Sequence, residues 1–515
     1  MSVKVDLPER YNASTLLDAN LEAERARKVA LICGDEQVTY GELLDRVCAM
    51  GRALRQLGVG REQRVLLVLD DTPAFPIAFF GAMRIGAVPV AVNPLYRAAD
   101  YRYFVEDSDA RAVVAEHTYL EKVRQALAGY PEPVAVVTTG ARAAEAHSLL
   151  ELLAAERGDL APAGTHRDDM AFWLYSSGST GKPKGVVHLH HDIPYTCETY
   201  ARQILRITAD DVAFGRVLFH AYGLGGSLTF PFWAGATSIL RPGRPTPQGL
   251  LQTLQRHRPT LFFSVPTLYN AIVASPEARE ADLSFLRMCV SAAEPLAPET
   301  WRRWRETFGH EIMDGIGSTE LLHIFCSNAP GAVRPGSSGQ PVPGYELQIC
   351  DWEGRPVAPG EVGSLRVKGD SAAPFYWHQH EKSQRTMRGE WSETGDRYRV
   401  DAEGYYWYEG RADDMIKVAG EWVSPIEIEN VLIEHPAVGE AAAIGVTVDG
   451  LARIKAVVVL APGAAPTPQL VPQLQQWCKS RLQRHQYPHI VVFVDELPKT
   501  FTGKIQRFML REAGA

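Results

Sequence analysis

The stretch Tyr175-Ser-Ser-Gly-Ser-Thr-Gly-Lys-Pro-Lys-Gly185 lies between two apolar runs, residues 170–174 and 186–187. Small residues let backbone N–H groups approach phosphate oxygens closely, while hydroxyls add donors and lysines add positive charge. The stretch does not fit a P-loop, because Ser176 stands where the first glycine belongs and Pro183 stands where the Mg²⁺-binding Ser/Thr belongs. It therefore predicts a phosphate-binding loop of another kind. A Gly/Ser-rich surface loop without a ligand is the alternative.

The chain has 515 residues, which is long for one hydrophobic core, so two or more domains are expected. Its net charge of −8 argues against a general nucleic-acid binder. The 7 cysteines form no C-x-x-C pair, which favours reduced thiols over a disulfide framework or a zinc site. The first ten residues lack an apolar signal core and no apolar run reaches the roughly 18 residues of a membrane span. A cytoplasmic protein that does not bind membranes is expected.

Apolar strand-like runs alternate with helical stretches over about the first 320 residues. The run at 64–69 precedes a helical stretch at 73–85, and those at 260–265 and 287–291 also lead into helices. Uninterrupted apolar strands separated by helices indicate mainly parallel sheets covered on both faces, a doubly wound α/β fold. Ligands of such sheets bind beyond the carboxyl ends of the strands, where the glycine-rich loop and Asp314-Gly-Ile-Gly-Ser-Thr-Glu320 are expected.

Two smaller units are expected after about residue 335. Turn signals crowd together there, with short strands such as residues 363–367 between them, which predicts a small β-rich subdomain. The last 100 residues or so predict a compact α+β unit. Its elements are expected at 415–418 (strand), 424–435 (helix), 440–446 and 454–460 (strands), 468–484 (helix) and 489–494 (strand).

Four motifs follow the glycine-rich loop: Asp314–Glu320, Thr394-Gly-Asp396, residues 408–420 and Pro498-Lys-Thr-Phe-Thr-Gly-Lys504. In this order the five motifs resemble those of the adenylate-forming superfamily, which comprises acyl- and aryl-CoA ligases, carrier-protein adenylation domains and firefly luciferases. The resemblance covers nearly the whole chain and is nearest to benzoate-CoA ligases. It implies two steps: a carboxylate attacks the α-phosphate of ATP, giving an acyl-adenylate and pyrophosphate, and a pantetheine thiol then displaces AMP.

The resemblance implies a nucleotide and magnesium site, as a reaction between anions requires cations and donors directed at the phosphoryl oxygens. Lys504 would bridge the substrate carboxylate and the α-phosphate, whereas Thr180 and Glu320 would hold Mg²⁺. As isolated residues, Lys504 would be an exposed lysine and Glu320 a helix-start carboxylate. The implied nucleotide-binding set is Ser176, Ser177, Ser179, Thr180, Lys182, Lys184, Asp314, Gly315, Thr319, Asp396, Arg411 and Lys504.

The resemblance also implies an aryl pocket with two walls of small and apolar residues. His323 and Ile324 would close the end that faces the para position, which favours a compact single-ring acid; a buried core histidine is the alternative for His323. His220 matches an aromatic gate where benzoate ligases tend to carry phenylalanine, and it could bond a ring substituent such as the amine of anthranilate or a hydroxyl. The walls would be Ala221, Tyr222 and Gly223 on one side and Ser291, Ala292, Gly315, Ile316, Gly317, His323 and Ile324 on the other.

Asp413 matches the hinge about which a mobile C-terminal domain turns, withdrawing Lys504 before the thiol enters beside Gly420. The predicted domains are 1–412, with the β-rich subdomain at about 335–412, and 413–515. The expected enzyme is an aryl-CoA ligase that uses ATP, Mg²⁺ and coenzyme A, as a monomer or homodimer.

One stretch departs from the family. Relatives usually carry Tyr-Lys-x-Pro-Arg, suited to CoA phosphates, where this chain has His485-Gln-Tyr-Pro-His489. An enzyme that loads an aryl acid onto a carrier protein's phosphopantetheine is therefore an alternative. An aliphatic acyl-CoA ligase and an inactive nucleotide-binding protein are others, the last disfavoured because all five motifs are present.

Overall fold

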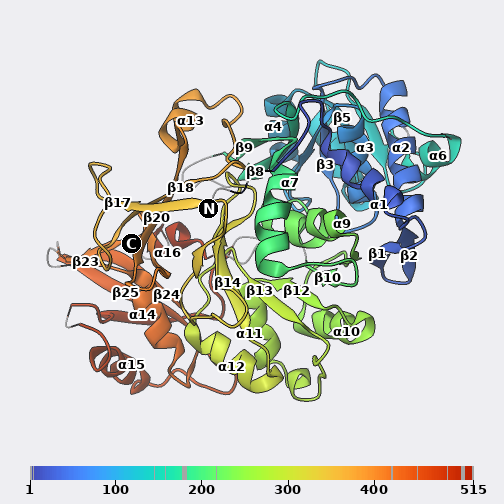
Figure 1. Cartoon of the computed structure of the whole chain (residues 1–515). Coiled ribbons are helices and arrows are strands. Elements are labelled where there is room, and N and C mark those ends of the chain that lie inside the picture. Colours follow the sequence, from blue (N-terminus) through green and yellow to red (C-terminus); the bar gives the residue numbers. More distant parts are fainter. Residues whose placement is uncertain are drawn as a thin grey trace.

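The computed structural model describes residues 3, 5–143, 145–156, 158–176, 182–215, 217–418, 421–448, 451–483, 485–499 and 505–512. Their strands form sheets of 7, 9, 5, 3 and 2 strands. Figure 1 shows β3, β5, α2 and α3 at one end of the molecule and β24, β25, α14 and α15 at the other, with β12 to β14 between them. None of the described helices has both the length and the apolar character needed to cross a membrane.

The 7-stranded sheet has the order β7-β6-β5-β3-β4-β8-β9, parallel except for the last pair. Val65 and Leu67 of β3 belong to a core that includes α2 and α3, whereas Leu66 and Val68 belong to a second core with α4 and α5. Alternate residues of one strand are thus buried on both faces. The elements are β3 (Arg64–Val68), β4 (Val88–Ala91), β5 (Ala110–Ala115), β6 (Ala135–Thr138), β7 (His147–Ser148), β8 (Met170–Ser176), β9 (Lys184–Leu189), α2 (Tyr40–Gln56), α3 (Ala74–Arg84), α4 (Ala98–Ser108), α5 (Leu120–Leu127) and α6 (Leu149–Ala155).

The 9-stranded sheet has the order β16-β15-β14-β13-β12-β10-β11-β1-β2, parallel from β14 to β1 and antiparallel at both edges. Residues of both large sheets share one hydrophobic core. The strands are β1 (Val29–Cys33), β2 (Glu36–Thr39), β10 (Val212–Phe214), β11 (Thr237–Leu240), β12 (Leu261–Ser264), β13 (Met288–Ser291), β14 (Ile312–Gly317), β15 (Ile324–Ser327) and β16 (Gln340–Pro341). The helices of this region are α1 (Asp18–Glu22), α7 (Asp192–Thr196), α8 (Ala221–Leu224), α9 (Phe230–Ala234), α10 (Pro247–His257), α11 (Pro266–Ala274) and α12 (Pro298–Phe308), with π-helical turns at Cys197–Leu205 and Gly225–Thr229. The predicted doubly wound, mainly parallel fold is confirmed.

The predicted β-rich unit is also present as an antiparallel 5-stranded sheet. It comprises β17 (Glu346–Cys350), β18 (Gly363–Lys368), β19 (Met387–Arg388), β20 (Trp391–Val400) and β21 (Tyr406–Arg411), with α13 (His380–Thr386) beside it.

The last unit has the predicted α+β order and a core of its own. Helix α15 ends at Lys479 rather than near residue 484, and a tighter turn follows it in which the Arg481 N–H donates to the Cys478 carbonyl, three residues earlier. The elements are β22 (Ile416–Val418), β23 (Glu421–Val423), α14 (Pro425–Ile433), β24 (Val438–Val448), β25 (Leu451–Leu460), α15 (Leu470–Lys479), β26 (Ile490–Phe493) and α16 (Arg507–Glu512).

Candidate functional site

Strands β8 and β9 hold the two ends of the glycine-rich loop side by side, with Ser176 paired to Lys184. The Tyr175 hydroxyl donates to Asp107 Oδ2 at 2.6 Å, and the Tyr103 hydroxyl donates to the Pro183 carbonyl at 2.8 Å. Helix α4 therefore anchors both ends of the loop. The predicted ligands Ser177, Ser179 and Thr180 lie outside the described residues.

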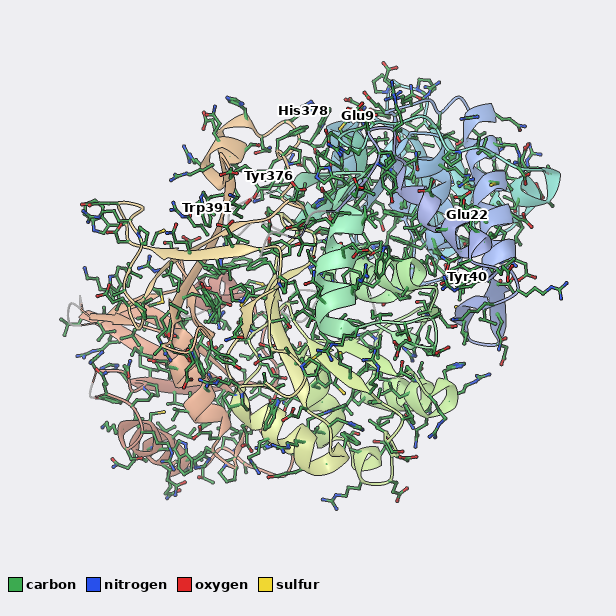
Figure 2. The ribbon with its side chains drawn as sticks, viewed as in Figure 1. Glu9, Glu22, Tyr40, Tyr376, His378 and Trp391 are labelled. Carbon is green, nitrogen blue, oxygen red and sulfur yellow. The ribbon has the colours of Figure 1, made fainter. Side chains whose placement is uncertain are left out.

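Lys184, Glu320 and Tyr376 form the charged centre of the site. The Lys184 Nζ lies 3.8 Å from Glu320 Oε1 and 4.0 Å above the Tyr376 ring. The Tyr376 hydroxyl donates to the same Glu320 oxygen at 2.7 Å. Figure 2 shows Tyr376 next to β9, with which it pairs at Val186. Burial lowers the pKa of Lys184, an effect that the Glu320 carboxylate opposes and nearby cations reinforce. This partly buried pair has the charges that a phosphate and a magnesium ion require.

The described residues contain no cluster of three or more His, Cys, Asp or Glu that could hold a metal ion. Glu320 is nevertheless suited to Mg²⁺, because this ion commonly takes one or two carboxylates and completes its shell with substrate phosphates and water. The residues present fit a magnesium ion that arrives with a nucleotide.

Asp396 and Arg411 of the predicted nucleotide-binding set lie together across β20 and β21. Arg411 Nη1 donates to Asp396 Oδ1 and to the Thr394 carbonyl, both at 3.0 Å. Gly395 lies at φ +74°, in the left-handed region, and a side chain there would meet the Arg411 guanidinium at 2.9 Å. The Arg411 charge also contributes to the lowered pKa of Lys184, so this pair lies near the charged centre.

Tyr222 and His323, which are predicted on opposite walls of the aryl pocket, are hydrogen-bonded to each other. The Tyr222 hydroxyl donates to the Ser264 carbonyl at 3.2 Å and the Val290 carbonyl at 2.9 Å, at the ends of β12 and β13. His323 Nε2 donates to the Tyr222 carbonyl at 3.2 Å, and burial lowers the pKa of His323 to about 3. The ring is therefore neutral, and its Nδ1 is an acceptor without a hydrogen-bond partner among the described residues.

The opposite wall comes from β13, β14 and β15. Ser291 pairs with Asp314, and burial raises the pKa of Asp314 well above its usual range. Side chains at Gly315 and Gly317 would meet Cys326 O at 2.8 Å and His323 O at 2.4 Å, so glycine is required for the close approach of β15. The motif Asp314–Glu320 is partly a strand, because its first four residues belong to β14. The remaining predicted wall residues lie on the same elements or beside them: Ala221, Gly223, Ala292, Ile316 and Ile324.

Three other predicted residues are among those that the structure describes: Lys182, His220 and Asp413. The Lys182 Nζ lies 4.6 Å above the Tyr103 ring. His220 begins α8, and its Nδ1 accepts from the Tyr222 N–H at 3.4 Å. Asp413 lies in the exposed turn between β21 and β22. Gly420 and Lys504 lie outside the described residues.

Sequence reasoning missed Tyr376 and His188. His188 Nε2 lies 2.7 Å from the Thr319 carbonyl, one residue before Glu320. The run His188-Leu-His-His-Asp192, directly after the glycine-rich loop, was a signal that could have found His188. Tyr376 has no comparable local signal.

Comparisons with known proteins show which family the chain belongs to. The family described as AMP-binding enzyme matches residues 17–377, and the AMP-binding enzyme C-terminal domain matches residues 427–504. A benzoate–CoA ligase of Thauera aromatica is 46% identical, covering 99% of this chain and 97% of the relative. A 4-hydroxybenzoate–CoA/benzoate–CoA ligase of Rhodopseudomonas palustris is 45% identical, covering 98% and 94%.

A solved structure of the anthranilate CoA ligase AuaEII with anthranoyl-AMP has a TM-score of 0.96 and 41% identity, covering 99% of this chain and 98% of that one. A benzoate CoA ligase from Burkholderia xenovorans has a TM-score of 0.91 and 47% identity, covering 97% and 100%. The similarity extends over both matched regions and the whole fold. The chain belongs to the AMP-binding enzyme family.

Proposed function

We propose that this chain is an AMP-forming aryl-CoA ligase. It activates a small aromatic carboxylate with ATP and transfers the acyl group to coenzyme A. The observation that carries the proposal is the Lys184–Glu320–Tyr376 cluster, whose Glu320 lies in the β14–β15 turn, with the hydrogen bond between His323 and Tyr222 at the end of the same turn. The same turn therefore carries a residue for the phosphate site and a residue for the apolar pocket. The benzoate– and anthranilate–CoA ligases that the chain resembles support the same reaction.

In the first step a carboxylate oxygen attacks the α-phosphorus, the bond to the β-phosphate oxygen breaks, and pyrophosphate leaves. Mg²⁺ supplies charge neutralisation on the phosphates when it is bound. Lys184 adds a cation beside Glu320, and its partial burial strengthens its attraction to phosphate oxygens. We assign Thr180 with Glu320 to the metal, Ser176, Ser177, Ser179, Lys182 and Thr319 to the phosphates, and Asp314, Gly315, Asp396 and Arg411 to the nucleoside.

In the second step the CoA sulfur attacks the carbonyl carbon of the acyl-adenylate, and the bond to AMP breaks. We assign Lys504 to the first step and Gly420 to the entry of the thiol in the second. Residues 413–515 form the domain that turns about Asp413, and residues 1–412 form the other. The chain acts as a monomer or homodimer.

Asp413→Pro is expected to slow thioester formation at least about tenfold while adenylation changes less, because proline restricts the φ angle of the proposed hinge. Single-turnover pyrophosphate release and thiolysis of supplied aryl-AMP measure the two steps separately. Lys504→Ala is the matched variant and is expected to show the reverse pattern. Equal losses in both steps for Asp413→Pro would remove residue 413 from the hinge.

His323 and Ile324 would close the end of the pocket that faces the para position, which favours a single-ring acid. His323 Nδ1 has no hydrogen-bond partner among the described residues, so a hydroxyl or amine on the ring would be accommodated as well as benzoate. We expect pyrophosphate release with benzoate, aminobenzoates or hydroxybenzoates to exceed that with short fatty acids by at least about tenfold. A short fatty acid would leave part of the apolar pocket unfilled, which costs about 1–3 kcal/mol.

The assay is a pyrophosphate-release screen of these acids, with and without coenzyme A. AMP and aryl-CoA are the expected products. A preference for short fatty acids would contradict the aryl pocket. Aryl-AMP turnover only with a phosphopantetheinylated carrier protein would replace coenzyme A by a protein acceptor, and no turnover with any acid would remove the enzymatic function.

A further inference from the structure

A buried histidine–aspartate pair lies behind the charged centre and bonds its backbone. His188 of β9 and Asp192 of α7 have side chains that are 0% exposed. His188 Nδ1 lies 2.7 Å from Asp192 Oδ2, and its Nε2 lies 2.7 Å from the Thr319 carbonyl. The Phe172 ring stacks on the imidazole, with centroids 5.2 Å apart. The imidazole is therefore fixed in both position and orientation.

The Nε2 of His188 acts as a donor. A carbonyl oxygen can only accept, so Nε2 carries a proton. Asp192 Oδ2 accepts the Leu189 N–H at 3.0 Å and also bonds Nδ1 of His188. Asp192 therefore holds one ring nitrogen while the other donates to Thr319.

The bonded carbonyl belongs to a tight turn that presents Glu320. Leu322 has φ +66°, which is strained for a residue with a side chain, and its N–H also donates to the Thr319 carbonyl. The Leu321 N–H donates to Ser318 Oγ at 3.2 Å. His188 supplies the bond that ties this turn to β9, the strand that carries Lys184.

His191 belongs to the same cluster and bonds a second segment that contacts the Glu320 backbone. Its Nε2 lies 3.1 Å from Asp192 Oδ1 and 2.9 Å from the Asp370 carbonyl. Near Asp370, the Ala373 N–H donates to the Glu320 carbonyl at 2.7 Å. The backbone of Glu320 is thus held from both sides by segments bonded to this cluster.

We propose that His188, held by Asp192, is a positioning residue that fixes the Thr319–Glu320 backbone so that the Glu320 carboxylate meets the magnesium ion of the nucleotide. The inference rests on the proposed function, since it concerns the metal ligand of the adenylation step. Residues that orient a metal ligand without touching the metal typically change metal affinity or activity by 10–100-fold when replaced.

Two replacements of His188 separate positioning from general stability. Glutamine places its amide nitrogen near the position of Nε2 and keeps a donor for Thr319, whereas asparagine reaches only the position of Nδ1. His188→Asn is expected to raise the Mg²⁺ concentration for half-maximal adenylation at least about tenfold, and His188→Gln by less than about threefold. Thiolysis of supplied aryl-AMP needs no nucleoside triphosphate, so it is expected to stay near the wild-type rate in both variants of His188.

His190→Asn is the matched control, because His190 is equally buried and its Nδ1 accepts the Ala13 N–H at 3.1 Å. It is expected to leave the half-saturating Mg²⁺ concentration unchanged. If His188→Asn loses thiolysis as well, which indicates misfolding, Asp192→Ala provides the test. This variant removes the partner of Nδ1, so the imidazole is no longer held in its orientation towards the Thr319 carbonyl, and half-saturating Mg²⁺ should again rise.

The outcomes are distinct. An active wild type with unchanged half-saturating Mg²⁺ in His188→Asn and Asp192→Ala overturns the inference, as do equal shifts for asparagine and glutamine at residue 188. A wild type that releases no pyrophosphate with any acid overturns the proposed function instead.

Discussion

Replacing Glu320 with glutamine is expected to slow adenylation by about 10²–10³-fold, because a metal ligand and a preorganised charge are each worth several kcal/mol in the transition state. The amide preserves the shape of the side chain and can still accept the Tyr376 hydroxyl, so the turn should keep its conformation. The lost property is the negative charge that faces Mg²⁺ and Lys184. Single-turnover pyrophosphate release measures the effect.

Tyr376→Phe is the matched control for Glu320→Gln. It removes one hydrogen bond to the carboxylate and leaves the charge, so a loss of about tenfold is expected from a bond worth about 1.5 kcal/mol. Thiolysis of supplied aryl-AMP should be near normal in both variants, because pyrophosphate has already left. A loss of thiolysis equal to that of adenylation would assign Glu320 a structural role only.

Local patterns predicted much of this architecture. Buried apolar runs such as residues 64–69 predicted the parallel strands, and β3 has both faces covered, as such a run requires. The glycine-rich stretch predicted a loop that is not a P-loop, and a strand rather than a helix follows Pro183. Both features depend on the chemistry of adjacent residues, which the sequence displays directly.

The contacts that build the site could not be predicted in this way. Tyr376 and Glu320 are 56 residues apart, and His188 and Thr319 are 131 apart, so only the tertiary fold brings each pair together. The motif Asp314–Glu320 was expected beyond a strand, but the glycines let β15 pair closely with it and β14 continues to Gly317. Partner strands and register are properties of the whole sheet, and no local pattern specifies them.

Arg507→Met is expected to destabilise the last unit by about 3–5 kcal/mol, because it leaves a buried carboxylate without its cation. Arg507 Nη2 donates to both Glu429 oxygens at 2.8 Å, and their side chains are 10% and 8% exposed. The pair joins α14 to α16, which begins three residues after Lys504 in the chain. Urea unfolding followed by tryptophan fluorescence would report the shift through Trp422 and Trp477.

The stability lost in Arg507→Met should increase as the pH rises. Burial raises the pKa of Glu429 above its unfolded value even with Arg507 present, and removing the cation raises it further. A carboxyl whose folded pKa is raised contributes stability fully below its unfolded pKa and loses it as the pH rises through the folded pKa. The deficit of Arg507→Met should therefore be small in mildly acidic buffer and increase towards neutral pH.

Two further variants test whether the unpaired charge of Glu429 causes the loss of stability in Arg507→Met. Arg511→Met changes an arginine on the same helix, which pairs with Asp414 of the β21–β22 turn at 2.6 Å; the two side chains are 35% and 18% exposed, and the loss should be less than about 1 kcal/mol. The double variant Glu429→Leu/Arg507→Met removes both charges, and replacing a buried ion pair by apolar residues is often nearly neutral, so it should recover most of the stability. Equal losses in Arg507→Met and the double variant would show instead that packing of the arginine stem stabilises this unit.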